Sequence, residues 1–182
     1  MRPIVLAMCV FAAGCGGQSL DSPTEPTRAT TSSAQTPAQS GTELPFRGSF
    51  TIATTGVLNC PPTCPPTSLQ ITGAEEGTAT HLGRFTAVSV DVVDLAAATS
   101  TGTFNFTAAD GDQLFTTTSG GEEEFIPPNT SIVALVATIV GGTGRFEGAT
   151  GMFTIRHRGT IDFASGTASG SGSLEGQINL NR

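Results

Sequence analysis

The chain has 182 residues, and its 15 acidic and 8 basic side chains give a formal net charge of -7. All of the basic residues are arginines, and the acidic balance excludes the basic surface on which nucleic-acid binding depends. The 23 glycines, the frequent threonines and the scarcity of good helix formers favour strands joined by turns. Tryptophan and tyrosine are both absent, which disfavours a sugar-binding platform built on aromatic rings.

Residues 1–15 have the pattern of an export signal. Arg2 supplies a positive charge, residues 3–13 form an apolar run, and Gly14-Cys15 ends it. The run is too short for a transmembrane helix, which needs about 20 residues, and it fits a secretory signal peptide. The sequence Phe11-Ala-Ala-Gly-Cys15 resembles the lipobox of bacterial lipoproteins. The resemblance implies that Cys15 carries the lipid and becomes the mature N-terminus; the alternative is an ordinary signal peptide with an incidental cysteine.

Residues 16–43 form a linker rich in serine, threonine and proline. Its few apolar side chains cannot offset the entropy lost on ordering, so we expect it to be disordered. Together, the linker and the lipobox-like Cys15 predict an exported protein that is anchored by a lipid to the cell envelope, at the outer membrane or the cell surface. Residues 44–182 are then the single folded domain.

Cys60 and Cys64 are the only cysteines of that domain. In an exported protein we expect them to form a disulfide bond. A metal site would need two further ligands, and His81 and His157 are the only histidines, so we predict no metal. A redox-active pair is disfavoured because three residues, two of them prolines, separate the cysteines.

The first half of the domain contains runs that alternate between apolar and polar residues, as half-buried strands do. Residues 45–52 alternate in this way, and residues 68–72 and 101–107 give further strands. Residues 78–82 and 83–95 form either one long strand or two strands. Residues 73–77 read Gly-Ala-Glu-Glu-Gly, which predicts a turn.

In the second half, Asp110-Gly-Asp112 predicts a hairpin turn. Residues 120–125 carry two glycines and three glutamates and predict a charged loop. Residues 132–140 form a continuous apolar run, which predicts a strand buried on both faces. Three more strands are expected, with Gly159 as a break between the first two: residues 152–158, 159–163 and 171–180.

About eight to ten strands with almost no helix indicate an all-β domain. The closely spaced turns favour a single antiparallel β-barrel, and a β-sandwich is the alternative.

The turn richest in glycine lies between residues 140 and 151. Its Gly-Gly-Thr-Gly run has the composition of a phosphate-binding loop, but such loops open a helix, and no run of helix formers follows here. We therefore predict a connection between two strands, in which Arg145 faces solvent and glycines allow positive φ or close backbone approach. The residues that mark this connection are Gly141, Gly142, Gly144, Phe146 and Gly151.

The run Ile139-Val-Gly-Gly-Thr-Gly-Arg-Phe-Glu-Gly-Ala-Thr-Gly151 resembles a segment of dirigent proteins and allene oxide cyclases. The resemblance implies a closed antiparallel barrel of about eight strands with a central apolar cavity. It carries no catalytic residue to this chain, because the catalytic acids and arginines of those families have no matched positions here.

Two functions fit these features. The first is a non-enzymatic surface lipoprotein whose barrel binds a small apolar ligand or a partner, without a cofactor. The second is a cofactor-free cyclase or isomerase, which would need polar groups inside the barrel; no nucleophile elbow is present, and binding is favoured. Alternation puts Arg156 and His157 on opposite faces, so one of them points inward. The candidates for inner polar groups are His81, Arg84, Asp91, Arg156 and His157.

Overall fold

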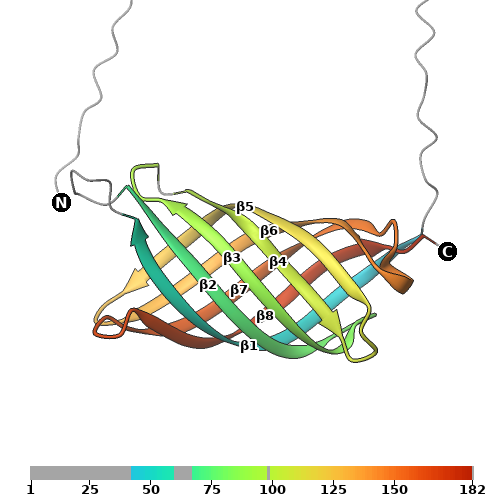
Figure 1. Ribbon diagram of the computed structural model, residues 1–182, viewed down its shortest axis with the longest axis horizontal. Helices are drawn as coiled ribbons and strands as arrows, with labels where there is room; N and C mark the ends of the chain where they lie inside the picture. The colour runs from blue at the N-terminus through green and yellow to red at the C-terminus, as the bar shows by residue number, and fades with distance from the viewer. Residues whose placement is uncertain (1–41, 60–66, 98, 182) are drawn as a thin grey trace, which may run out of the picture. The chain divides into compact units, whose positions relative to one another are not determined.

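The structure is a computed structural model that describes residues 42–59, 67–97 and 99–181. Cys15, Cys60 and Cys64 lie outside the described residues, as does nearly all of the linker, so the lipid anchor and the disulfide stay predictions. The described residues form eight strands and one short 3-10 helix (Figure 1). In chain order these are β1 (Glu43–Asn59), β2 (Ser68–Ala79), β3 (Gly83–Asp94), β4 (Thr99–Ala108), β5 (Gln113–Ile126), β6 (Thr130–Gly142), η1 (Gly144–Phe146), β7 (Thr150–Asp162) and β8 (Thr167–Asn179).

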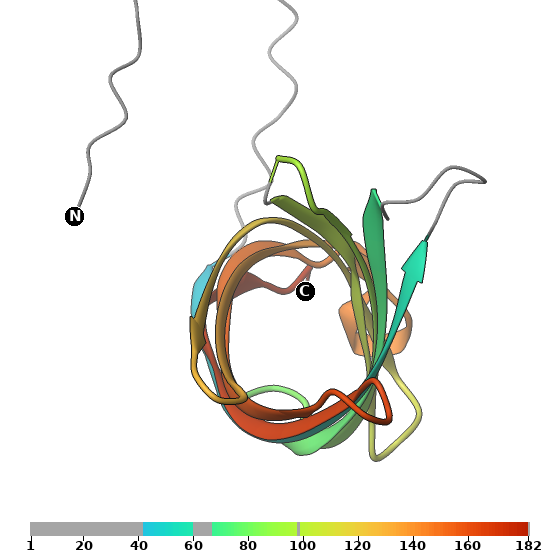
Figure 2. The same cartoon turned by 90° about the vertical axis from the view of Figure 1, so that its left-hand side faces the viewer.

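Each strand pairs antiparallel with the next, and β8 pairs with β1, so the sheet closes on itself as a barrel (Figure 2). Phe50 of β1, for example, lies opposite Gly77 of β2 on one side and Gly172 of β8 on the other. Closure removes the unpaired edges that the two sheets of a sandwich would keep. The predicted antiparallel barrel is therefore confirmed, and the sandwich alternative is wrong.

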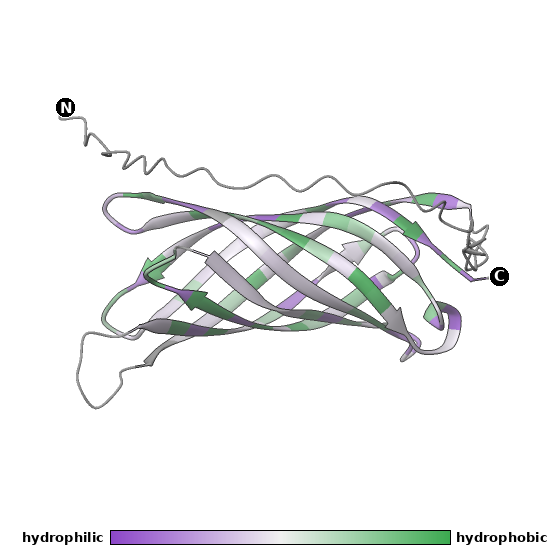
Figure 3. Ribbon diagram, turned by 90° about the horizontal axis from the view of Figure 1, so that it is seen from above, coloured by the Kyte–Doolittle hydropathy of each residue, from purple (hydrophilic) through white to green (hydrophobic). Residues whose placement is uncertain are grey.

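Alternation along the strands decides which side chains fill the barrel, and apolar and polar bands follow one another along the ribbon (Figure 3). In β1, Phe46, Phe50 and Ile52 are buried, while Arg47, Ser49 and Thr51 face outward, as predicted for a half-buried strand. Burial of one such ring contributes about 1.5–3 kcal/mol. Six rings form a connected cluster, which we call the phenylalanine cluster: Phe46, Phe50, Phe85, Phe104, Phe106 and Phe153.

The predicted turn at residues 73–77 is wrong, because these residues lie inside β2. Gly77 makes room for a neighbouring strand instead of bending the chain. A Cβ on it would lie 2.2 Å from the carbonyl oxygen of Ser49 and 2.8 Å from the Cβ of Phe50. The chain turns only after β2, where His81 adopts a φ of 67°. Gly77 in this strand therefore marks a close approach of two strands, β1 and β2.

The predicted charged loop at residues 120–125 is also wrong, since β5 continues through it. Gly120 and Gly121 adopt φ values of 71° and 131°, and the pairing with β6 shifts register between Ser119 and Glu122. These two residues form a β-bulge, which bends the strand without ending it.

Two predictions for the last strands need correction. The β6 strand is buried on one face only, because Val136 and Val140 point outward and are 42% and 60% exposed. The β7 strand runs through Gly159 without a break or a register shift. A Cβ on Gly159 would lie 3.2 Å from the carbonyl oxygen of Ser169, so this glycine lets β8 pack closely.

The two ends of the barrel differ in what covers them. At the end where β1 begins lie the β2–β3 and β4–β5 turns and η1, with Leu82, Phe146 and Ala149 buried beneath them; we call this the closed end (Figure 1). The opposite end, which carries the β5–β6 and β7–β8 hairpins, is the open end. Among the described residues no helix has the length and hydropathy that a membrane span needs.

Candidate functional site

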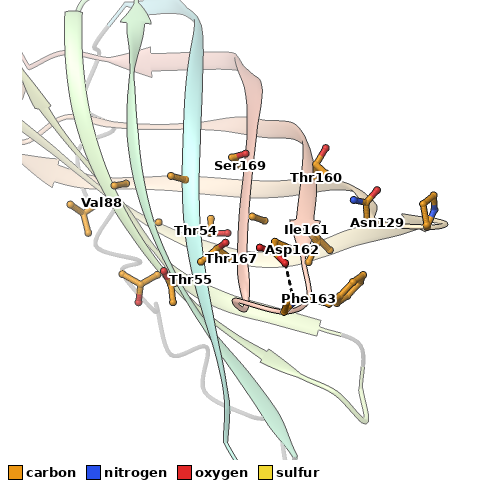
Figure 4. A pocket seen from close by; sticks show the side chains of 17 residues that line it. Thr54, Thr55, Val88, Asn129, Thr160, Ile161, Asp162, Phe163, Thr167 and Ser169 are labelled. Atoms are coloured by element: carbon orange, nitrogen blue, oxygen red, sulfur yellow. Dashed lines mark hydrogen bonds between the residues drawn. The ribbon is translucent and has the colours of Figure 1, made fainter.

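A hollow of about 1200 Å³ lies at the open end, beside the β7–β8 hairpin (Figure 4). Most of the strand residues that line it, such as Thr55, Val88 and Thr160, face outward, and fewer, such as Thr54 and Ile161, belong to the inward-facing set. The hollow therefore lies over the outer face of β1, β2, β3, β7 and β8 near the open end, and not inside the barrel. Most of its lining is alanine, threonine or apolar, and a wall of this kind suits an apolar molecule with few polar groups.

Two exposed phenylalanines stand at this rim. Phe163 lines the hollow and packs edge-on against Phe125 of β5, with their ring centroids 6.0 Å apart. The two residues are 66% and 48% exposed. Asp162 holds the hairpin that presents Phe163, because its carboxylate accepts hydrogen bonds from the Ser165 hydroxyl and the Ala164 amide, which lower its pKa. The rim thus combines a fixed turn with exposed apolar area.

Glu75 of β2 lies further inside the barrel and is 1% exposed. Its Oε1 accepts a 2.7 Å hydrogen bond from the Ser89 hydroxyl on β3, whereas its Oε2 is buried and has no partner among the described residues. The carboxyl group lies over the inner side of Gly73, where a Cβ would be 2.4 Å from Oε1, and Glu75 does not line the hollow. Burial raises the pKa of Glu75 to about 7, against the opposing effect of the Ser89 bond and with a smaller contribution from Asp91.

Asp91 of β3 is the second inner carboxyl group and is 8% exposed. The hydroxyl of Thr118 on β5 donates a 2.6 Å hydrogen bond to its Oδ1. Gly102 of β4 gives the carboxyl its room, since a Cβ there would lie 2.4 Å from Oδ1. Burial raises the pKa of Asp91, and the Thr118 bond opposes this. Both carboxyl groups thus rest over glycines and each is held by one hydroxyl.

His157 is the inward member of the Arg156 and His157 pair, as one of the two was predicted to be. It is half-buried between Phe153 and Ile155 on one side and Gly159 on the other along the inner face of β7, while Arg156 is exposed. Burial lowers the pKa of the imidazole, so the neutral form is favoured inside the barrel.

The other candidates do not join these inner groups. His81 lies in the β2–β3 turn at the closed end, and Arg84 and Arg156 are exposed on the outside of the barrel. The sequence analysis missed Glu75 because it assigned the residue to a turn. Gly73, Glu75, Gly77 and Ala79 recur at every second position, and this period was the available signal for an inward position of Glu75.

The glycine-rich run connects β6 to β7, as predicted. Gly141 and Gly142 close β6, Gly151 lies in β7, and η1 between them buries Phe146. Gly144 adopts a φ of 55°. A Cβ on it would overlap a carboxylate from the β4–β5 turn, so both its conformation and its surroundings require glycine.

Arg145 within this run is exposed, as predicted, yet it joins three connections at the closed end. Its guanidinium pairs with Asp110 and Asp112 of the β4–β5 turn. It also donates to the carbonyl oxygens of His81 and Leu82 in the β2–β3 turn. These contacts give Arg145 a structural role. No group of three or more histidine, cysteine or acidic side chains forms a metal site in the part of the chain that the structure describes.

Comparison with known proteins finds distant similarity to solved structures. No protein-family model matches the sequence, and no curated protein matches it. Among solved structures, the chain is similar to the pterocarpan synthase dirigent protein GePTS1, with 13% identity over 85% of this chain and 100% of that chain and a TM-score of 0.46. The pterocarpan synthase dirigent protein PsPTS1 is 11% identical over 78% of this chain and 97% of that chain, with a TM-score of 0.44.

The evidence for the fold is the pairing of the eight strands themselves. Identity this low carries no substrate or activity from those proteins to this chain.

Proposed function

We propose that the barrel is a binding module that holds a small, predominantly apolar ligand at its open end. The observation that carries this proposal is the hollow of about 1200 Å³, whose wall is mainly small and apolar. Pockets that bind small molecules commonly enclose roughly 300–1,000 Å³, so the space suffices for one such ligand. Each Å² of apolar surface that the ligand buries would contribute about 25 cal/mol.

The rim phenylalanines support the same proposal. Phe125 and Phe163 leave apolar area exposed beside the hollow, and a bound ligand would cover part of it. The only charged residue in the lining, Asp162, already has its carboxylate bonded to its own turn. An uncharged apolar ligand therefore meets no unpaired charge at the rim.

The proposal is tested with N-phenyl-1-naphthylamine, an uncharged dye whose fluorescence rises in apolar surroundings. We expect saturable binding by the full-length protein and at least about tenfold weaker binding by Ala164→Trp, which puts an indole ring into the hollow. Thr117→Trp is the matched control, because Thr117 is exposed on the outer wall of β5. No saturable binding, or equal binding by both variants, would contradict the proposal.

We also propose that a lipid on Cys15 holds the barrel at the cell envelope. The lipobox-like sequence and the polar linker support this. The β1 strand begins at the closed end, so the linker joins the barrel at the end opposite the hollow. Cys15→Ser should move the protein from the membrane fraction to the soluble fraction, and unchanged fractionation would disprove the anchor.

A cofactor-free isomerase is the second candidate, and one observation favours it. Burial inside the barrel raises the pKa of Glu75 to about 7, the range in which a carboxyl group both donates and accepts protons near neutral pH. Turnover of a bound ligand by the wild type and its loss in Glu75→Gln, followed by mass spectrometry, would establish catalysis. Release of every bound ligand unchanged would leave binding as the function.

A further inference from the structure

We propose that the hollow on the outer face of the barrel takes a single-chain amphiphile with an anionic head group, and that Arg158 binds this head group. The inference rests on the proposed binding function and adds the charge class of the ligand. The apolar chain would lie along the hollow, and the charged oxygens of the head would meet the guanidinium at its edge.

The pairing of the strands places Arg158 beside the hollow. Thr160 and Ser169 lie opposite each other on β7 and β8, and both line the hollow. Arg158 and Ser171 are the next pair on the same outer face, one step closer to the closed end. Two residues along a strand correspond to about 7 Å, which the long side chain of an arginine covers. The Arg158 side chain and the hollow therefore lie on the same side of the sheet.

Arg158 is a cation without a partner of its own. In the part of the chain that the structure describes, its guanidinium makes no ion pair and donates no hydrogen bond. The residues opposite it on the two neighbouring strands, Ile132 of β6 and Ser171 of β8, are uncharged. Its donors are therefore available to a ligand.

The charges around this position favour an anionic ligand, although the chain as a whole carries a net charge of -7. Arg156 lies two residues before Arg158 on the same outer face of β7, and it also has no ionic partner among the described residues. Glu124 of β5 lies two strands from Arg158, about 10 Å away. Asp162 lies about 13 Å along β7, and its carboxylate is bonded to its own turn. The two arginines thus give this edge of the hollow local positive charge.

The floor of the hollow supplies the apolar part of the site. A row of small outward-facing residues leads from Ser169 on β8 through Ala53 on β1 and Ala74 on β2 to Val88 on β3, which is 55% exposed. Neighbouring strands lie about 4.8 Å apart, so the row extends about 19 Å from β7 to β3. An extended chain with its head at Arg158 would run across the strands over this row and cover Val88.

An arginine distinguishes head groups by charge and by geometry. Its planar guanidinium offers five N–H donors and no acceptor, and it binds carboxylate or phosphate oxygens through two parallel hydrogen bonds. A hydroxyl head would accept a hydrogen bond without the charge, and an ammonium head would be repelled. Because Arg158 is exposed, we expect attraction and repulsion to change the affinity by about threefold each.

The experiment compares three probes with the same apolar chain: decanoate, n-decanol and n-decylamine. Binding to the full-length protein is measured by displacement of N-phenyl-1-naphthylamine at neutral pH in about 0.15 M salt, which screens charges more than about 8 Å away. We expect decanoate to bind about tenfold more tightly than n-decylamine. The uncharged n-decanol reports on the hollow without the head group.

Arg158→Gln removes the charge, so the preference for decanoate over n-decylamine should fall at least about threefold, while n-decanol binds as before. Arg158→Glu should lower the preference further, because it puts a negative charge in the same place. Arg84→Gln is the matched control, since Arg84 is exposed on the outer face of β3 near the closed end, away from the hollow.

Equal binding of decanoate and n-decylamine by the wild type, or a wild-type preference that persists in both Arg158 variants, overturns this inference; binding of n-decanol then leaves the proposed function in place. A wild type that binds none of the three probes overturns the proposed function itself.

Discussion

The closed end and the open end of this barrel are built from the same strands, but they differ in whether their polar side chains have hydrogen-bond partners. At the closed end, Arg145 meets two aspartates and two carbonyl oxygens, and the phenylalanine cluster fills the barrel beside it. Toward the open end, Glu75 has one oxygen without a partner among the described residues, and a hollow of about 1200 Å³ lies on the outer face of the strands.

This difference separates residues that stabilise the barrel from residues that are free to bind. A packed apolar end with satisfied polar groups contributes stability and leaves no room for a ligand. A buried carboxyl group with an unpaired oxygen lowers stability, and carboxyl groups with a perturbed pKa are found clustered at functional sites. The predictions below test this division.

The largest effect is expected for Phe106→Ala. Phe106 is fully buried, and its ring contacts those of Phe46, Phe85, Phe104 and Phe153. Loss of the ring should lower the free energy of unfolding by about 3–5 kcal/mol, measured by urea denaturation. Phe163→Ala at the open rim is the matched control and should cost little. Equal losses in the two variants would remove the distinction between the ends.

The next largest effect is expected for Glu75→Gln, which should raise the free energy of unfolding at pH 8. The folded state holds the Glu75 proton up to a pKa of about 7, whereas an exposed glutamate loses it near 4.5, so folding stability falls as pH rises between these values. By pH 8 the penalty approaches about 3 kcal/mol, which the variant should recover. Denaturation at pH 8 should show a more stable variant, and at pH 4.5 nearly equal proteins. A less stable variant at pH 8 would mean that the carboxylate is satisfied.

A smaller loss is expected for Arg145→Ala. The pairs with Asp110 and Asp112 are partly exposed, and exposed ion pairs contribute about 1 kcal/mol or less. The loss should diminish in concentrated salt, which screens the charges. Arg156→Ala on the outer wall serves as the control for removing an exposed arginine. If both variants lose the same amount, the contacts at the closed end add nothing specific.

The smallest effect is expected for His157→Gln. Burial lowers the pKa of His157, so below pH 6.5 the unfolded chain takes up a proton more readily, and folding stability falls as pH drops. The variant should flatten this fall. The measurement is clearest in the Glu75→Gln background, where the opposing slope of Glu75 is absent. An unchanged slope would show that His157 is solvated in the folded protein.

The fold could be predicted from the sequence because alternation and glycine-rich connections are local signals. Residues 45–52 alternate clearly, and the run from Gly141 to Gly151 connects two strands as expected. The errors came from glycines whose role depends on a neighbouring strand. Gly77 and Gly159 make room for the neighbouring strands β1 and β8, and a single sequence does not reveal which strands will lie that close.

The candidate site was only partly predictable for the same reason. Asp91 and His157 were identified because alternation limits a side chain to one of two faces. Glu75 was missed because two flanking glycines imitate a turn, and its bond to Ser89 joins strands whose register is set by the closed sheet. The hollow itself depends on where the hairpins end, which no local pattern encodes.

The most direct test of the division between the two ends is a titration of the isotopically labelled full-length protein with N-phenyl-1-naphthylamine, followed through its backbone amide resonances. Binding at the open end predicts shifts at Gly73, Phe163 and Ala168, which line the hollow, and none at Phe146 of the closed end. Shifts centred on Phe146, or no saturable shifts at all, would contradict it.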